Sequence, residues 1–317
     1  MATTSYHVPV FLEETLAHLH LMPGAVIVDG TLGGGGHAEA ILERTSPDGI
    51  LIGLDVDPDA IAEAGARLAP FGPRVRLVHA SFRELDAIAA DFAPLAIDGV
   101  LLDLGVSSHQ LDAAERGFRF SPGPESPLDM RMNRAEPGTT AASLLATLTA
   151  GELERVFSQY GQLPGARRLA RAIVDRRAEM PLATAKDLTE LIAGIGIGRG
   201  RSHNPATLVF QALRIAVNDE LAALEEGLQA AIRVLRPGGR LVVLTYHSLE
   251  HRIVKQTLRS AAKGCVCPPV FPVCRCGRKP SVELATRRAI EPSAAEIEKN
   301  PRARSARLRA AIRLEAA

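Results

Sequence analysis

Four consecutive glycines follow a short apolar run near the start of this chain. The run Val26–Val28 ends at Asp29, and Gly33–Gly36 come a few residues later. Glycine lets the backbone of a turn lie directly against a ligand because it has no Cβ, and the free N–H groups of the helix that follows favour a negatively charged group there. A second apolar run ends at Asp55, where a carboxylate can accept hydrogen bonds from ribose hydroxyls. These residue types and spacings predict a nucleoside-binding site.

Polar side chains also follow two later apolar runs. Asp103 closes the fourth run and precedes Ser107 and Ser108, and His247 follows the fifth. Because the carboxyl ends of parallel strands meet at one edge of a sheet, we expect Asp103 and His247 near the ligand. The serines suit helix capping as well as catalysis, and a single histidine is more often a hydrogen-bonded side chain than a functional one.

The elements that must position these groups are five short apolar runs without polar alternation, which is typical of strands buried on both faces of a parallel sheet. They are residues 26–28, 50–54, 75–78, 97–102 and 240–245. Helical patterns separate the first four, and a glycine- and proline-rich loop followed by helices separates the fourth from the fifth. We therefore expect an α/β sheet domain formed by residues 1–111 and 206–317, interrupted by an inserted helical domain at 112–205.

Two classes of nucleotide suit the glycine turn, a dinucleotide or S-adenosylmethionine. A dehydrogenase fingerprint is Gly-x-Gly-x-x-Gly with nothing special before it. Here Asp29 stands at the strand end, where it suits the amino or sugar side of an amino-acid-bearing nucleoside. Phe82 follows the third strand, at a position where such folds place a side chain beside the adenine ring. A core position suits Phe82 equally well. The pattern favours S-adenosylmethionine, and a NAD-dependent dehydrogenase is the main alternative enzyme.

All four cysteines lie in one segment, as Cys265, Cys267, Cys274 and Cys276. Four thiolates can bind a structural zinc ion. The single residue within each pair is tighter than the usual spacing of about two to four residues. The sequence therefore predicts no metal site, with structural zinc as the alternative.

The charged residues of the chain are nearly balanced overall but unevenly distributed. Lys and Arg together number 37 against 36 for Asp and Glu, so net charge alone indicates no polyanionic partner. Basic residues nevertheless cluster locally, and such clusters form either solvated faces or contacts to an RNA backbone. The candidate RNA-binding residues are Arg167, Arg168, Arg171, Arg302, Arg304 and Arg307.

No signal peptide or membrane-spanning run is present in the sequence, so we expect a cytoplasmic enzyme.

Several segments, taken in order, resemble the MraW (RsmH) family of S-adenosylmethionine-dependent 16S ribosomal RNA cytosine-N4 methyltransferases. The resemblance covers nearly the whole chain and rests on segments that are more specific together than any glycine motif. They are His7–Val10, Val28–Gly33 with Gly35–His37, Asp103–Ser108, Gln110–Asp112, Arg116–Phe118, Pro127–Met132, Phe210–Ile215, His247–Glu250 and Asn300–Ser305.

The resemblance implies a Rossmann-like class I methyltransferase sheet with an inserted all-helical domain that helps to recognise the substrate. It implies as target the exocyclic N4 amino group of a cytidine in the decoding region (P site) of the small ribosomal subunit. Monomer and homodimer both stay open. The cofactor contacts that it implies are Gly35, Gly36, His37, Asp55, Phe82, Asp103 and Gln110.

For the chemistry, the hypothesis is that Asp103 and His247, with Ser107 or Ser108, surround the amino group. An acceptor near the amino hydrogens helps to localise the nitrogen lone pair and then takes the proton. If Asp103 serves the cofactor alone, His247 becomes the better candidate. Tyr246 stands where the family commonly has phenylalanine. A ribosome-assembly factor that binds cofactor and RNA without chemistry, and a methyltransferase of another RNA, remain as alternatives.

Overall fold

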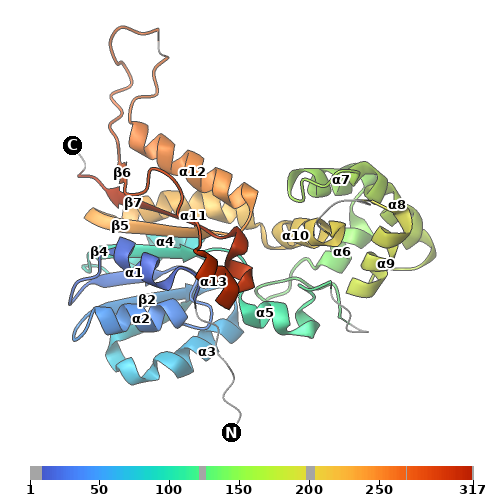
Figure 1. The fold of residues 1–317 in the computed structure, drawn as a ribbon, viewed down its shortest axis with the longest axis horizontal. Coiled ribbons are helices and arrows are strands. Elements are labelled where there is room, and N and C mark those ends of the chain that lie inside the picture. The colour runs from blue at the N-terminus through green and yellow to red at the C-terminus, as the bar shows by residue number, and fades with distance from the viewer. Residues whose placement is uncertain (1–8, 121–125, 198–203, 269, 316–317) are drawn as a thin grey trace. The chain divides into compact units, whose positions relative to one another are not determined.

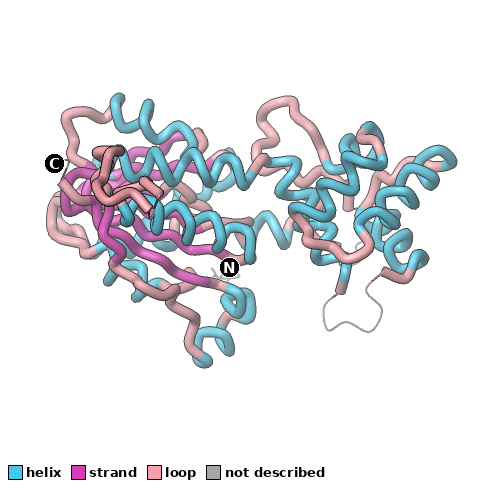
Figure 2. The backbone as a smooth tube through the Cα atoms, turned by 90° about the horizontal axis from the view of Figure 1, so that it is seen from above, coloured by secondary structure: helices cyan, strands magenta, loops and turns pink. Residues whose placement is uncertain are grey.

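The computed structural model describes residues 9–120, 126–197, 204–268 and 270–315, and its backbone is drawn in Figures 1 and 2. These residues form two compact units. The first combines Met1–Gly105 with Leu221–Ala317, and the second is Val106–Glu220. Within the described ranges, no helix has both the length and the apolarity needed to cross a membrane.

The first unit is built on a seven-stranded sheet with the order β3-β2-β1-β4-β5-β7-β6. The first five strands run parallel, whereas β7 is antiparallel to both β5 and β6. The strands are β1 (Val26–Asp29), β2 (Ile50–Asp55), β3 (Val75–His79), β4 (Ile97–Asp103), β5 (Leu235–Thr245), β6 (Val282–Leu284) and β7 (Arg307–Arg313). This order, in which the direction of strand addition reverses beside β1, confirms the expected α/β, Rossmann-like fold.

Helices cover both faces of this sheet, as Figures 1 and 2 show. Alternate strand residues supply the two cores: Ile27, Leu51 and Leu101 on one face, and neighbours such as Val28 and Leu102 on the other. The first face packs against α1 (Leu12–Leu19), α2 (Gly36–Arg44) and α3 (Pro58–Leu68). The second packs against α4 (Leu85–Asp91), α11 (Glu220–Val234) and α12 (Ser248–Lys263). The remaining elements are the 3-10 turns η1 (Ala69–Arg74), η2 (Phe82–Glu84) and η4 (Pro301–Ser305), and α13 (Ala294–Lys299).

The five expected strands are present, and the structure adds β6 and β7. The segment of β7 carries three arginines and two alanines, a composition with weak strand preference. Its position between β5 and β6 buries residues on both faces, so packing outweighs local propensity. The candidate RNA-binding residue Arg307 therefore lies on a strand inside the sheet.

The second unit is helical around a core of its own. Its elements are α5 (Ser108–Asp112), η3 (Ala114–Arg116), α6 (Ala141–Thr147), α7 (Ala150–Gln159), α8 (Ala166–Glu179), α9 (Ala185–Ile195) and α10 (Pro205–Asn218). It begins earlier and ends later than the expected insert of 112–205, because Val209, Phe210 and Leu213 of α10 pack in this core. α10 ends at Asn218, and Asp219, which has a left-handed backbone (φ 50°), separates it from α11.

Candidate active site

The turn between β1 and α2 is held by backbone hydrogen bonds and leaves open space beside Gly33. The N–H of Gly33 donates to Asp55 Oδ2 at 2.9 Å. Gly33 has φ +49° and no heavy atom within 4 Å of the position of a Cβ, so the space beside it is open. Gly35 has φ +77° and precedes α2 without a side-chain cap. The first N–H groups of α2 therefore remain available to a ligand.

Three carboxylates surround this turn, each at the carboxyl end of a strand. Asp29 ends β1, Asp55 ends β2 and Asp103 ends β4. Asp29 is 1% exposed and its Oδ1 accepts a hydrogen bond from the N–H of Thr31 at 3.1 Å. The backbone N–H of Asp103 donates to Thr31 Oγ1 at 2.6 Å, so the turn is also tied to β4.

The electrostatics of these carboxylates differ from those of exposed acids. Burial raises the pKa of Asp29 to about 7, although the nearby His37 opposes that shift. Burial also raises the pKa of Asp55, against the hydrogen bonds that its oxygens accept from the N–H groups of Asp57 and Gly33. Ionising these buried carboxylates together at one edge of the sheet is therefore energetically unfavourable, and a cationic ligand would offset that cost.

Asp103 lies between two other polar side chains of the same unit. The hydroxyl of Tyr246 donates to Asp103 Oδ1 at 2.8 Å, and burial together with this carboxylate raises the pKa of Tyr246 well above its usual value. Asp103 Oδ2 is 3.6 Å from His37 Nε2, beyond hydrogen-bonding distance. His37 is 6% exposed, and neither ring nitrogen has a hydrogen-bond partner among the described residues. Buried polar atoms without partners mark a place that a ligand can satisfy.

Phe82 stands at this edge but packs inward. Its ring lies against Gly227 of α11, where an added Cβ would overlap it, and its Cβ lies 3.1 Å from the Cβ position of Gly30. The place of Phe82 therefore requires Gly227, and a Cβ at Gly30 would crowd it. The preceding Ser81 starts η2 with a reciprocal cap to Glu84. Phe82 is thus partly buried in the core next to the glycine turn, and its contact with the adenine stays a prediction.

His247 is the N-terminal cap of α12. Its Nδ1 accepts a hydrogen bond from the N–H of Glu250 at 3.4 Å, and its Nε2 lies 3.1 Å from Glu250 Oε1. The other oxygen of this buried carboxylate accepts from the N–H groups of Tyr246 and His247, at 2.8 and 3.2 Å. Both ring nitrogens of His247 therefore lie near Glu250, although Nε2 makes no hydrogen bond among the described residues. The pair fixes the start of α12 directly after Tyr246.

Three expected site residues belong to the second unit. Ser107 Oγ accepts from the N–H of Gln110 at 3.1 Å, and Gln110 Oε1 accepts from the N–H of Ser107 at 2.9 Å. Ser107 therefore has the capping role, as half of this reciprocal cap of α5. The side chain of Ser108 lies outside the described residues. In the same unit, Phe118 is buried in the core and Phe120 packs edge-on against Phe210 at 5.8 Å.

The candidate RNA-binding arginines fall into two groups. Arg167, Arg168 and Arg171 are exposed on α8, and Arg302 and Arg304 are exposed on η4. Arg307 instead lies half-buried on β7, where its Nε pairs with Glu291 at 3.2 Å. The first five side chains are therefore accessible to an RNA backbone, and Arg307 is partly committed to the fold.

The four cysteines lie in the loop between α12 and β6. The first residue of β6, Val282, pairs with Arg313, and the neighbouring Ile312 pairs with Arg240 of β5. This end of β5 is opposite to the end at which Tyr246 and Asp103 lie. The cysteines are thus remote from the glycine turn along the sheet.

The geometry fits a nucleoside that carries a positive charge. Asp55 can accept from ribose hydroxyls, and the exposed backbone at Gly33 leaves room for the ligand's chain. A dinucleotide would bring an anionic pyrophosphate towards Asp29 and Asp103, which Coulomb repulsion disfavours. Two hydrogen bonds of Asp103 were not predicted from the sequence: its backbone N–H donates to the Thr31 hydroxyl, and its carboxylate accepts from the Tyr246 hydroxyl. No local pattern in the sequence indicates which group on another strand a hydroxyl will contact.

Comparison with known proteins places the chain in a family. The model of the MraW methylase family matches residues 4–314. A ribosomal RNA small subunit methyltransferase H from Symbiobacterium thermophilum is 51% identical over 98% of this chain and 98% of its own length. Proteins of the same name from Syntrophotalea carbinolica (52% identical, 97% and 98% covered) and Heliobacterium modesticaldum (50% identical, 98% and 99% covered) are similar along their whole length. The chain belongs to the MraW methylase family.

Proposed function

We propose that this protein transfers a methyl group from S-adenosylmethionine to the exocyclic N4 amino group of a cytidine in the 16S rRNA of the small ribosomal subunit. The observation that carries the proposal is the convergence of Asp29, Asp55 and Asp103 around a glycine turn with open space beside Gly33. The names of the relatives, as small-subunit rRNA methyltransferases, support the substrate class. A protein that acts on ribosomal RNA in this way would work in the cytoplasm.

The residues of the turn suit each part of this cofactor. Asp55 would accept from the ribose hydroxyls, and Gly35, Gly36 and the start of α2 would hold the amino-acid carboxylate. His37, with unpartnered buried ring nitrogens, and Asp29 would bind the amino-acid end. Phe82 would border the adenine from its place beside the turn. Gln110, which the resemblance also assigns to the cofactor, is occupied in the cap of α5.

S-adenosylmethionine supplies an already activated methyl group on a sulfonium, so the protein's work is to place and deprotonate the amine. We assign the proton acceptor to Asp103 Oδ2, since Tyr246 already donates to Oδ1 and His37 Nε2 is 3.6 Å from Oδ2. His247 is assigned a positioning role, because Glu250 faces both of its ring nitrogens. It holds the start of α12 and so the backbone of Tyr246.

Substrate recognition is assigned to the basic surfaces. Arg167, Arg168 and Arg171 present three charges on exposed positions of α8, and Arg302 and Arg304 present two on η4. Arginines on exposed positions neutralise phosphates and make binding strongly dependent on salt. The target base must also be accessible, unpaired or withdrawn from its stack, before its amino group can reach a carboxylate.

The test is methyl transfer from labelled cofactor to small subunits purified from cells that lack this protein. The variants are Asp103→Asn and His247→Asn, with cofactor affinity measured by calorimetry alongside. We expect Asp103→Asn to bind cofactor and lose turnover, and His247→Asn to lose mainly thermal stability.

Full turnover by Asp103→Asn would overturn the assignment of the proton acceptor. The opposite pattern, a stable His247→Asn without turnover, would return that role to His247. Cofactor and RNA binding without any transfer by the wild-type protein would instead indicate an assembly factor. Transfer to another RNA and not to small subunits would contradict the substrate.

A further inference from the structure

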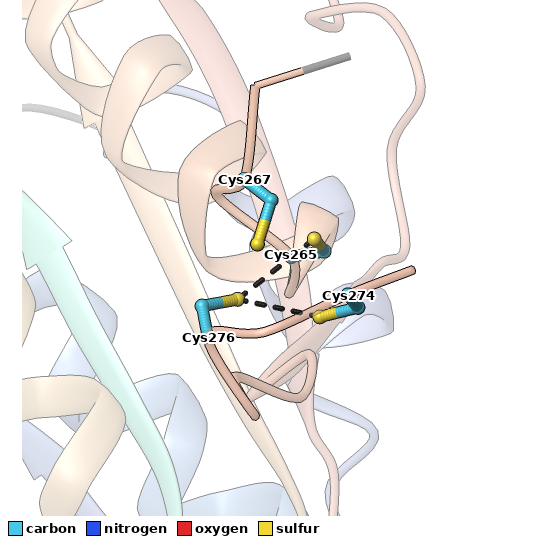
Figure 3. Close-up of side chains that lie close together, drawn as sticks. All are labelled: Cys265, Cys267, Cys274 and Cys276. Carbon is cyan, nitrogen blue, oxygen red and sulfur yellow. Dashed lines mark hydrogen bonds between the residues drawn. The ribbon is translucent and has the colours of Figure 1, made fainter. Parts of the chain in front are cut away.

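The loop between α12 and β6 brings four sulfur atoms together. The Sγ atoms of Cys265, Cys267, Cys274 and Cys276 all lie within 4.8 Å of one another (Figure 3). Cys276 Sγ is 3.5 Å from Cys274 Sγ and 3.8 Å from Cys265 Sγ. Two cysteine pairs that are separate in the sequence thus meet at one point.

These separations match a single tetrahedral metal ion. Four thiolates at about 2.3 Å from a zinc ion lie about 3.8 Å from one another by the geometry of a tetrahedron. A disulfide requires sulfurs at about 2.05 Å, well below either separation in Figure 3. A cluster of several iron atoms would hold its four cysteines farther apart.

The backbone around the sulfurs also suits a metal site. The N–H of Arg275 donates to Cys267 Sγ at 3.3 Å. Hydrogen bonds of this kind orient metal ligands and stabilise their negative charge. Gly277, directly after Cys276, has φ +63°, and nothing within 4 Å surrounds the position of a Cβ there. Glycine at this position therefore allows the left-handed backbone that follows the second cysteine pair.

The loop has no apolar core of its own among its described residues. Its apolar side chains Val266, Val270, Phe271 and Val273 are exposed by 56%, 83%, 47% and 70%. They form no core that would offset the conformational entropy of fixing the loop. Segments too small for a hydrophobic core are commonly stapled by a metal or by disulfides.

We propose that Cys265, Cys267, Cys274 and Cys276 bind one structural Zn²⁺ ion. The ion closes the loop at the edge of the sheet opposite to the glycine turn, so it has no part in the chemistry at Asp103. It makes the loop a rigid projection that displays the basic side chains Arg275, Arg278 and Lys279.

The first test is the metal content of protein purified without a histidine tag, by mass spectrometry of the elements. We expect about one zinc ion per chain, released when a thiol reagent modifies the cysteines. The variant Cys274→Ala/Cys276→Ala should lose the metal, whereas Cys274→His should keep it, because imidazole also binds zinc. Val270→Ser, in the same loop, is the matched control and should retain full occupancy.

The second test is limited proteolysis, which reports on the loop whether or not the enzyme is active. The exposed bonds after Arg275 and Arg278 are trypsin sites, whereas Lys279 precedes proline and resists cleavage. Cleavage at these sites should be slow in the wild type, in Cys274→His and in Val270→Ser. It should be at least about tenfold faster in Cys274→Ala/Cys276→Ala or after chelation, with the circular dichroism of the sheet unchanged.

Four results would overturn the proposal. Metal-free wild-type protein with four titratable thiols would remove the site, and iron in place of zinc would contradict the identity of the ion. A mass deficit that reduction restores would indicate disulfides instead. Equal trypsin sensitivity of the zinc-loaded and metal-free forms would remove the structural role.

Discussion

Asp29→Asn is expected to make the protein without cofactor more stable at alkaline pH. The Asp29 carboxyl has a pKa of about 7 in the folded protein against the ordinary value of 3.8, mainly because it is buried. The folded state therefore holds a proton that the unfolded state releases. The stabilisation is complete below about pH 3.8 and is lost as pH rises through about 7. Asparagine has the same shape, carries no charge and can still accept from the N–H of Thr31.

The difference between these two pKa values corresponds to roughly 4 kcal/mol when the group is fully ionised. Between about pH 5 and about pH 8, proton linkage through this one group lowers the free energy of unfolding of the wild type by roughly 2 to 3 kcal/mol relative to Asp29→Asn. Urea unfolding of both proteins across this range measures the difference. Asp91→Asn, at an exposed position, controls for net charge. A difference between wild type and Asp29→Asn that stays constant with pH would refute the reasoning.

Three further changes test other parts of the site. Asp55→Ala should weaken cofactor binding by roughly ten- to a hundredfold, since it removes the ribose acceptor; calorimetry showing unchanged affinity would contradict this role. Tyr246→Phe removes the hydroxyl that donates to Asp103, yet phenylalanine is common in the family, so turnover should fall by less than about tenfold while stability drops by about 1 kcal/mol. The double change Arg167→Glu/Arg168→Glu should weaken binding to small-subunit RNA and flatten its salt dependence without altering cofactor affinity; an unchanged salt slope would argue against an RNA contact there.

The strand-end carboxylates were predictable from sequence because their positions follow from the sheet itself. A buried apolar run has one carboxyl end, and parallel strands bring those ends together. Asp29, Asp55 and Asp103 indeed meet around the glycine turn. The same logic brought His247 to the correct edge of the sheet but did not reveal that its Nδ1 caps α12 and that its Nε2 lies beside the Glu250 carboxylate.

Features that depend on partners far away in the sequence were not predictable. β7 has little strand propensity of its own, and its place between β5 and β6 is what makes it a strand. The hydroxyl of Tyr246 donates a hydrogen bond to Asp103, which lies 143 positions away in the sequence. The spacing of Cys265 and Cys267 is unusual for zinc, yet the loop brings all four sulfurs together. In each case, tertiary contacts override what the local pattern indicates.

The most direct test of the proposed function is the identity of the methylated nucleoside. Small subunits lacking the modification are incubated with the protein and labelled S-adenosylmethionine, and the rRNA is then digested to nucleosides and analysed by mass spectrometry. We predict that the label is found in N4-methylated cytidine with the wild-type protein and is absent with Asp103→Asn. Label on another base, or on another atom of cytidine, would contradict the proposed reaction.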